Sequence, residues 1–152
     1  MSTILALDPG TSQTGWVLLK DGAVADSGVH PNHDVLRWVQ AGQGADVLAI
    51  EMMRARGMPT SNDEFKTLVW IGRFQQAWRE PEAVRLVYRQ DVKLHVCGSM
   101  KAKDANIRAA LLDQVGPQGL KRSPGPTYGV KSHAWAALGV AVTARHQIGA
   151  AA

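Results

Sequence analysis

Residues 47–50 form an uninterrupted apolar run, Val-Leu-Ala-Ile, which ends on Glu51. A strand with one solvent face alternates apolar and polar residues, whereas a continuous apolar run of this length is typical of a strand covered on both faces. Such a strand needs packed layers on each side of its sheet. The run therefore favours a layered α/β fold.

The order of the other segments extends this prediction to the whole chain. Strands are expected at residues 4–7, 15–19, 23–29 and 83–88, in addition to 47–50. Helices are expected at residues 31–41, 62–78, 103–114 and 133–146, and a basic loop rich in Gly and Pro at 117–126. Turn residues separate the first three strands, so these should be antiparallel, and helical crossovers should follow. We expect one α/β domain over residues 1–152.

Composition excludes several classes of protein. The 152 residues are 45% hydrophobic and 20% charged, which is too apolar for a disordered chain. No segment approaches the ~18 apolar residues of a membrane span, and the N-terminal residues, MSTILALDPG, lack the basic start of a signal peptide. The only cysteine, Cys97, cannot form an internal disulfide, which favours a reducing compartment. Secreted, membrane-embedded and fibrous proteins are thus excluded, and we expect the protein in the cytoplasm.

Charge is less informative. Lys and Arg number 17 against 13 Asp and Glu, a formal net charge of +4. This balance is compatible with a polyanionic partner such as nucleic acid, but it does not by itself indicate one.

Two acids, Asp8 and Glu51, each come directly after an apolar strand. If the two strands are neighbours in one sheet, both carboxylates emerge at the same edge and can share a divalent cation. Hard oxygen ligands of this kind suit Mg²⁺ or Mn²⁺. The alternative is structural: Asp8 caps the turn formed with Pro9 and Gly10, and Glu51 is a solvated strand end.

Four segments, in this order, span nearly the whole chain: ILALDPGTSQTGWVLL (4–19), LAIE (48–51), VCGSMKAK (96–103) and KSHAWAALGVAVTA (131–144). They resemble the first acidic strand, the second acidic strand, the Gly-containing basic loop and the closing helix of the RuvC family of Holliday-junction resolvases. The shortness of the region around residues 29–47 is similar to the phage-encoded branch of that family.

The resemblance implies a ribonuclease H-like fold, with a mixed five-stranded sheet flanked by helices. It also implies a homodimeric, metal-dependent and structure-selective DNA endonuclease, a crossover junction endodeoxyribonuclease. Such an enzyme resolves four-way junctions by symmetric hydrolytic nicking and leaves 5′ phosphates. Asp8 and Glu51 would be catalytic metal ligands for Mg²⁺ or Mn²⁺, two ions per active site. The expected location is the cytoplasm of a bacterium or of a phage-infected host.

The closing helix departs from the family pattern. The family places an acid at one or both of two positions three residues apart, and here these positions carry His133 and Ala136. A neutral imidazole can bind a metal or position the attacking water, so His133 is a candidate catalytic and metal-binding residue; Ala136 can do neither. Three interpretations remain open: His133 suffices, another acid such as Asp104 substitutes, or the chain is a form of low activity. His133 as a helix-capping or surface histidine, and Asp104 as an acid favoured by the helix dipole, are the structural alternatives.

Basic residues complete the resemblance. Lys93, Lys101 and Lys103 match positions that the family uses near the scissile phosphate, where Lys103 in particular would stabilise the pentavalent phosphorus. Arg54 stands where cellular members carry a base-stacking aromatic residue, and it would extend the DNA-binding surface. The structural alternative for all four is solvated surface charge.

Two other functions are compatible with these residues. The first is a catalytically weak module that binds branched DNA, which Ala136 favours. The second is a ribonuclease H-like nuclease acting on another substrate, such as an RNA–DNA hybrid.

Overall fold

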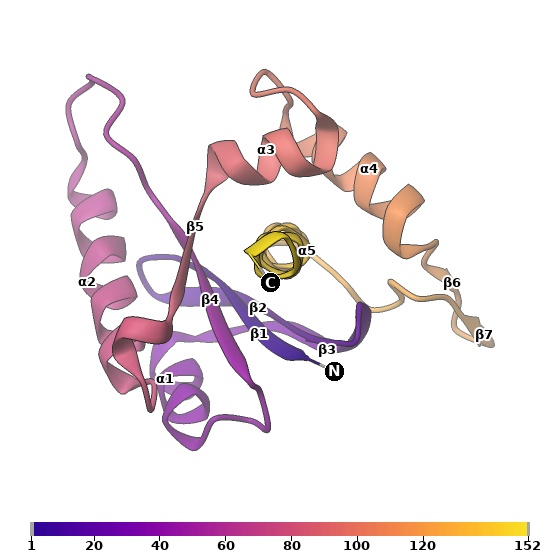
Figure 1. The fold of residues 1–152 in the computed structure, drawn as a ribbon, viewed down its shortest axis with the longest axis horizontal. Coiled ribbons are helices and arrows are strands. Elements are labelled where there is room, and N and C mark those ends of the chain that lie inside the picture. Colours follow the sequence, from indigo (N-terminus) through magenta and orange to yellow (C-terminus); the bar gives the residue numbers. More distant parts are fainter. Residues whose placement is uncertain (1, 152) are drawn as a thin grey trace.

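The computed structural model describes residues 2–151 and has a five-stranded sheet at its centre, with the strand order β3-β2-β1-β4-β5 (Figure 1). The strands are β1 (Thr3–Pro9), β2 (Gln13–Lys20), β3 (Ala23–Pro31), β4 (Val47–Met52) and β5 (Arg85–Tyr88). β1, β2 and β3 pair antiparallel, whereas β4 is parallel to β1 and β5 is parallel to β4. The predicted mixed sheet, with an antiparallel first half followed by crossovers, is confirmed.

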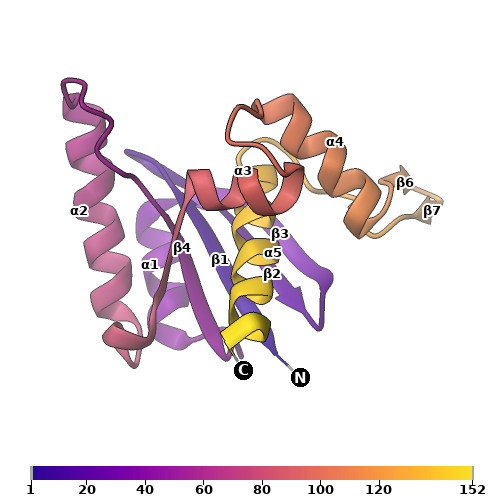
Figure 2. The same ribbon diagram turned by 45° about the horizontal axis from the view of Figure 1, so that its top comes forward.

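Helices cover both faces of this sheet. The helices α1 (Asn32–Ala41) and α2 (Asn62–Ala77) lie on one face, and α5 (Ala134–Ala151) lies on the other against β1 and β2. The helices α3 (Arg89–Cys97) and α4 (Asp104–Val115) pack on α5, which they cover from outside (Figures 1 and 2). Because α5 lies between the sheet and two helices, its AWAALGVAVTA sequence is apolar on nearly every side.

Two hydrophobic cores result, one on each face. Along β1, Leu5 and Leu7 point into the core beneath α1 and α2, while Ile4 and Ala6 point into the core around α5. This alternation is the two-residue period of a strand, and it directs Asp8, the next even position, toward α5. In β4, Leu48, Ala49 and Ile50 are all fully buried, which confirms the strand predicted to be covered on both faces.

The structure differs from the expected elements in four places. Residues 81–83 form a short 3₁₀ helix, so β5 begins only at Arg85. The helix α3 was not expected, because it follows β5 directly and has no side-chain cap at its start. The loop at 117–126 contains a small hairpin of β6 (Gly119–Leu120) and β7 (Ser123–Pro124). Finally, α5 begins at Ala134, so His133 lies just before the helix and not within it.

Within residues 2–151, no helix combines the length and apolar character that crossing a membrane requires.

Candidate active site

Asp8 and Glu51 come together because their strands are parallel neighbours. Leu7 of β1 pairs with Ile50 of β4, and each acid is the next residue along its strand. Both side chains point to the α5 face, following Ala6 and Ala49, which pack in that core. The predicted meeting of the two carboxylates at one edge of the sheet is confirmed.

The electrostatics of this pair are unfavourable without a cation. Burial of Asp8 and the adjacent negative charge of Glu51 raise the pKa of Asp8 from 3.8 to about 8, an effect that Arg89 partly offsets. At neutral pH the protonated Asp8 carboxyl then donates a hydrogen bond to Glu51. Two carboxylates that share a proton in this way favour any cation able to replace the proton.

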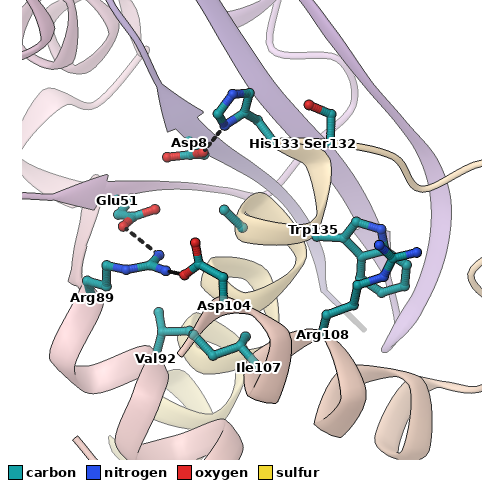
Figure 3. Close-up of a pocket in the computed structure, with 11 residues that line it drawn as sticks. Asp8, Glu51, Arg89, Val92, Asp104, Ile107, Arg108, Ser132, His133 and Trp135 are labelled. Carbon is teal, nitrogen blue, oxygen red and sulfur yellow. Dashed lines mark hydrogen bonds and ion pairs between the residues drawn. The ribbon is translucent and has the colours of Figure 1, made fainter. Parts of the chain in front are cut away.

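His133 approaches the pair from the start of α5. Its Nδ1 lies 3.4 Å from Oδ2 of Asp8, and 70% of its side chain is exposed (Figure 3). It occupies the N-terminal cap position, because its carbonyl accepts the hydrogen bond from the Ala137 N–H. The preceding residue, Ser132, has a left-handed backbone with φ +51°, which turns the chain into the helix.

Gly15 makes the close approach of His133 possible. It lies opposite Asp8 in the β1–β2 ladder, and a Cβ at this position would fall 2.5 Å from the His133 carbonyl. Atoms cannot approach so closely, so any side chain at position 15 would force the His133 segment away from β2. The residue that pairs with Asp8 on β2 must therefore be a glycine, because it lies against the His133 segment.

A buried hydrogen-bond network secures the turn that follows Asp8. Asn32, at the start of α1, is 1% exposed. Its Nδ2 donates to the Gly10 carbonyl (3.0 Å), and its Oδ1 accepts from the Thr14 hydroxyl (2.6 Å). Its own N–H donates to the Ser12 carbonyl (2.9 Å). Asn32 was not a predicted site residue, since the sequence indicated only a helix start at this point.

Arg89, the first residue after β5, was not among the predicted site residues either. Its Nη1 lies 3.4 Å from Oε1 of Glu51, and its Nη2 donates to the Asp104 carboxylate (Figure 3). The available signal was positional: like Asp8 and Glu51, Arg89 stands at the C-terminal end of a strand of the parallel half, two residues after a buried residue of the same core, Val87.

These residues line an open cavity of about 440 Å³. Its polar groups come from Asp8, Glu51, Arg89, Asp104, Arg108, Ser132 and His133. The remaining lining residues are Val92 of α3, Ile107 of α4, and Trp135 and Ala136 in the first turn of α5. Ala136 places only a methyl group at the wall.

A second hollow of about 220 Å³ adjoins the first, because Glu51 and Arg89 line both. Arg54 and Lys93 lie in its wall, and Arg54 stacks on the Tyr88 ring, with 3.9 Å between its Cζ and the ring centroid. The structure thus brings two of the predicted DNA-binding residues close to the acidic pair.

Lys101 and Lys103 lie elsewhere. Both are exposed, at and just before the start of α4, and neither lines the cavity that holds Asp8. The Lys103 N–H donates to Asn106 Oδ1 (2.9 Å), which caps the first turn of α4. A direct role of Lys103 at the phosphorus stays a prediction.

The fit of a metal ion is partial. Among residues 2–151, no three His, Cys, Asp or Glu side chains are arranged closely enough to hold a metal ion. The Asp8–Glu51 pair is nevertheless a hard-oxygen donor set whose shared proton a cation could replace. The donor chemistry therefore fits one divalent ion at the pair, completed by water or phosphate oxygens.

Comparisons with known proteins support the fold. No protein-family model matches the sequence, and no curated protein sequence is similar to it. The structure is similar to that of Thermus thermophilus RuvC, with TM-score 0.70, 16% sequence identity, and coverage of 97% of this chain and 96% of that one. It is also similar to T. thermophilus RuvC in complex with a Holliday junction substrate, with TM-score 0.69, 17% identity, and coverage of 97% and 95%. The chain therefore has a RuvC-like, ribonuclease H-like α/β fold, with a mixed five-stranded sheet flanked by helices.

Proposed function

We propose that this protein is a metal-dependent endonuclease that resolves four-way DNA junctions by symmetric nicking, leaving 5′ phosphates. One observation carries the proposal: Asp8 and Glu51 meet at the ends of the parallel strands β1 and β4, beside an open cavity in a RuvC-like fold. The short β3–α1 connection, in which Asn32 directly follows Pro31, favours the phage-type branch.

Asp8 and Glu51 would hold the catalytic metal. A bound Mg²⁺ or Mn²⁺ would supply a Lewis acid that activates water and stabilises charge on the phosphate during in-line hydrolysis. The two carboxylates would hold the ion at the cavity wall, and buried residues of β1 and β4 fix the strands that carry them.

His133 would accept a proton from the attacking water. Asp8 Oδ2 lies 3.4 Å from its Nδ1, so a proton on Nδ1 would face that oxygen and would leave Nε2 as the acceptor. The ring is mostly exposed at the cavity mouth, where a water molecule can reach it. An alternative role for His133 is direct metal binding through Nδ1, the nitrogen that faces Asp8.

Basic side chains would bind the DNA. Arg54 and Lys93 border the hollow next to Glu51, and Lys101 and Lys103 extend the positive surface from the start of α4. The position of Arg54 and Lys93 next to Glu51 supports a polyanion that passes over the acidic pair.

A homodimer would provide the second cut. On α2, Phe65 and Val69 are 54% and 63% exposed although both are large and apolar. They lie four residues apart on one helix face, and a second copy of the chain could bury them. Light scattering should give a dimeric mass for the wild type and a smaller one for Val69→Lys. A monomeric wild type at micromolar concentration would contradict paired incision.

The decisive experiment compares a labelled four-way junction, a linear duplex and an RNA–DNA hybrid, each with Mg²⁺ or Mn²⁺. We expect paired nicks in the junction alone, and their loss in Asp8→Asn and Glu51→Gln with junction affinity retained. Wild-type cleavage rates in either variant would refute this active site. Preferential cleavage of the hybrid would show that the substrate is an RNA–DNA hybrid and not a four-way junction.

A catalytically weak junction-binding module is the second candidate, and Ala136 favours it, since it adds no ligand to the cavity wall. Binding of the junction without nicks would support this candidate. Cleavage that appears only in Ala136→Asp would identify the alanine as the cause of inactivity.

A further inference from the structure

Arg89 places a fixed positive charge inside the cavity. Its guanidinium lies 3.4 Å from Glu51 and also donates to Asp104, so it bridges a β4 residue and an α4 residue (Figure 3). Asp104 is 86% exposed and Arg89 is 38% exposed, so the arginine is the more sheltered partner. Backbone geometry holds it there, because it is the first residue of α3 and directly continues β5.

The charges around the cavity limit how many cations it can take. Three carboxylates line it, those of Asp8, Glu51 and Asp104. The guanidinium groups of Arg89 and Arg108 also line it, but within the described residues only Arg89 is ion-paired with these acids. One divalent cation together with the Arg89 guanidinium would therefore balance the three carboxylates. A second divalent ion would have to share Glu51 with a guanidinium already beside it, and Ala136 adds no carboxylate to compensate.

We propose that Arg89 is a tethered cation that takes the place of one of two metal ions, so that each chain binds a single divalent cation at Asp8 and Glu51. A guanidinium has five N–H donors in a planar fork suited to phosphate oxygens. Its contacts with Glu51 and Asp104 use two of these donors and leave three, and Arg89 lines the cavity. In catalysis, which rests on the proposed function, these donors would hold a non-bridging oxygen of the scissile phosphate.

The test measures metal binding without DNA. Calorimetric titration of the full chain with Mn²⁺ should give one ion per wild-type chain. Arg89→Gln removes the charge and should bind a second ion, or bind the first at least about tenfold more tightly, since a like charge beside the ion is gone. Arg89→Lys keeps the charge and should bind one ion, as the wild type does.

Arg108→Gln is the matched control. Arg108 lines the same cavity but stacks over Trp135, 5.0 Å from the ring centroid, and has no ion pair with a carboxylate in the described part of the chain. Its loss should leave the Mn²⁺ stoichiometry and affinity unchanged. If Arg108→Gln has the same effect as Arg89→Gln, general cavity charge and not Arg89 sets the affinity, and the inference fails.

Two wild-type results also overturn the inference: binding of two ions, or no Mn²⁺ binding at all. Equal stoichiometry and affinity in the wild type and a folded Arg89→Gln would overturn it as well. The outcome is separable from that of the proposed function. If the chain binds one ion, with a stoichiometry or affinity that changes in Arg89→Gln, but cuts no junction, the inference is supported and the proposed function is contradicted. If the chain cuts the junction with two bound ions, the proposed function is supported and the inference is contradicted.

Discussion

Replacing Asp8 by Asn should stabilise the metal-free protein, and increasingly so as the pH rises. The unfolded chain releases the Asp8 proton near pH 3.8, whereas the folded chain retains it up to about pH 8. Between these values the folded state binds one more proton than the unfolded state, so wild-type stability falls as pH increases and the loss is complete above pH 8. The asparagine of the Asp8→Asn variant resembles the protonated acid, because its amide can still donate to Glu51, and it does not titrate.

The size of the effect follows from the pKa. At about 1.36 kcal/mol per pKa unit, the rise from 3.8 to about 8 corresponds to roughly 6 kcal/mol. The difference in unfolding free energy between Asp8→Asn and the wild type should therefore grow from near zero at pH 4 to several kcal/mol at pH 8. That is a large share of the ~5–15 kcal/mol by which a domain is stable.

Urea unfolding in the presence of a chelator, at pH values from 5 to 9, measures this difference. Asp113→Asn is the control, because Asp113 is an exposed acid on α4. Its unfolding free energy should equal that of the wild type at every pH. Saturating Mg²⁺ should restore the unfolding free energy of the wild type at pH 8, since the cation replaces the shared proton. It should change the unfolding free energy of Asp8→Asn little. A free-energy difference that stays constant across the pH range would refute the reasoning.

Three further perturbations test other parts of the structure. Gly15→Ala should displace His133, cost about 1–3 kcal/mol of stability and slow junction nicking at least tenfold, and an unchanged nicking rate would contradict the steric argument. Thr143→Val should raise the unfolding free energy by about 1 kcal/mol, because among the described residues the buried Thr143 hydroxyl has no hydrogen-bond partner, and a loss of stability would show that it has one. Replacing Lys101 and Lys103 together by Ala should weaken junction binding and reduce its salt slope by up to about 2, whereas an unchanged slope would leave both as surface charges.

The acidic pair could be predicted from the sequence because both acids follow apolar runs. The runs ending at Asp8 and Glu51 identify two strands, and the parallel pairing of those strands brings the ends together. The same local pattern located β2 and β3 and the helices α1, α2 and α4 to within a few residues.

The contacts of Arg89 and the helix α3 could not be found in this way. The helix follows β5 without a capping residue, and its buried Val92 and Val96 are a weak signal in nine residues. The role of Arg89 depends on Glu51 and Asp104, which lie 38 and 15 residues away in the sequence. No local pattern encodes such contacts.

The sequence by itself determined the layered fold, the placement of two acids at strand ends and the apolar character of the closing helix. These follow from burial patterns with periods of two or 3.6 residues, which need only near neighbours in the chain. Only the tertiary structure decided that Gly15 makes room for His133, that Asn32 holds the turn after Asp8 and that Arg89 neutralises Glu51. Each of these depends on the distance between atoms from different strands and helices, and packing sets that distance only once the whole sheet and its covering helices are assembled.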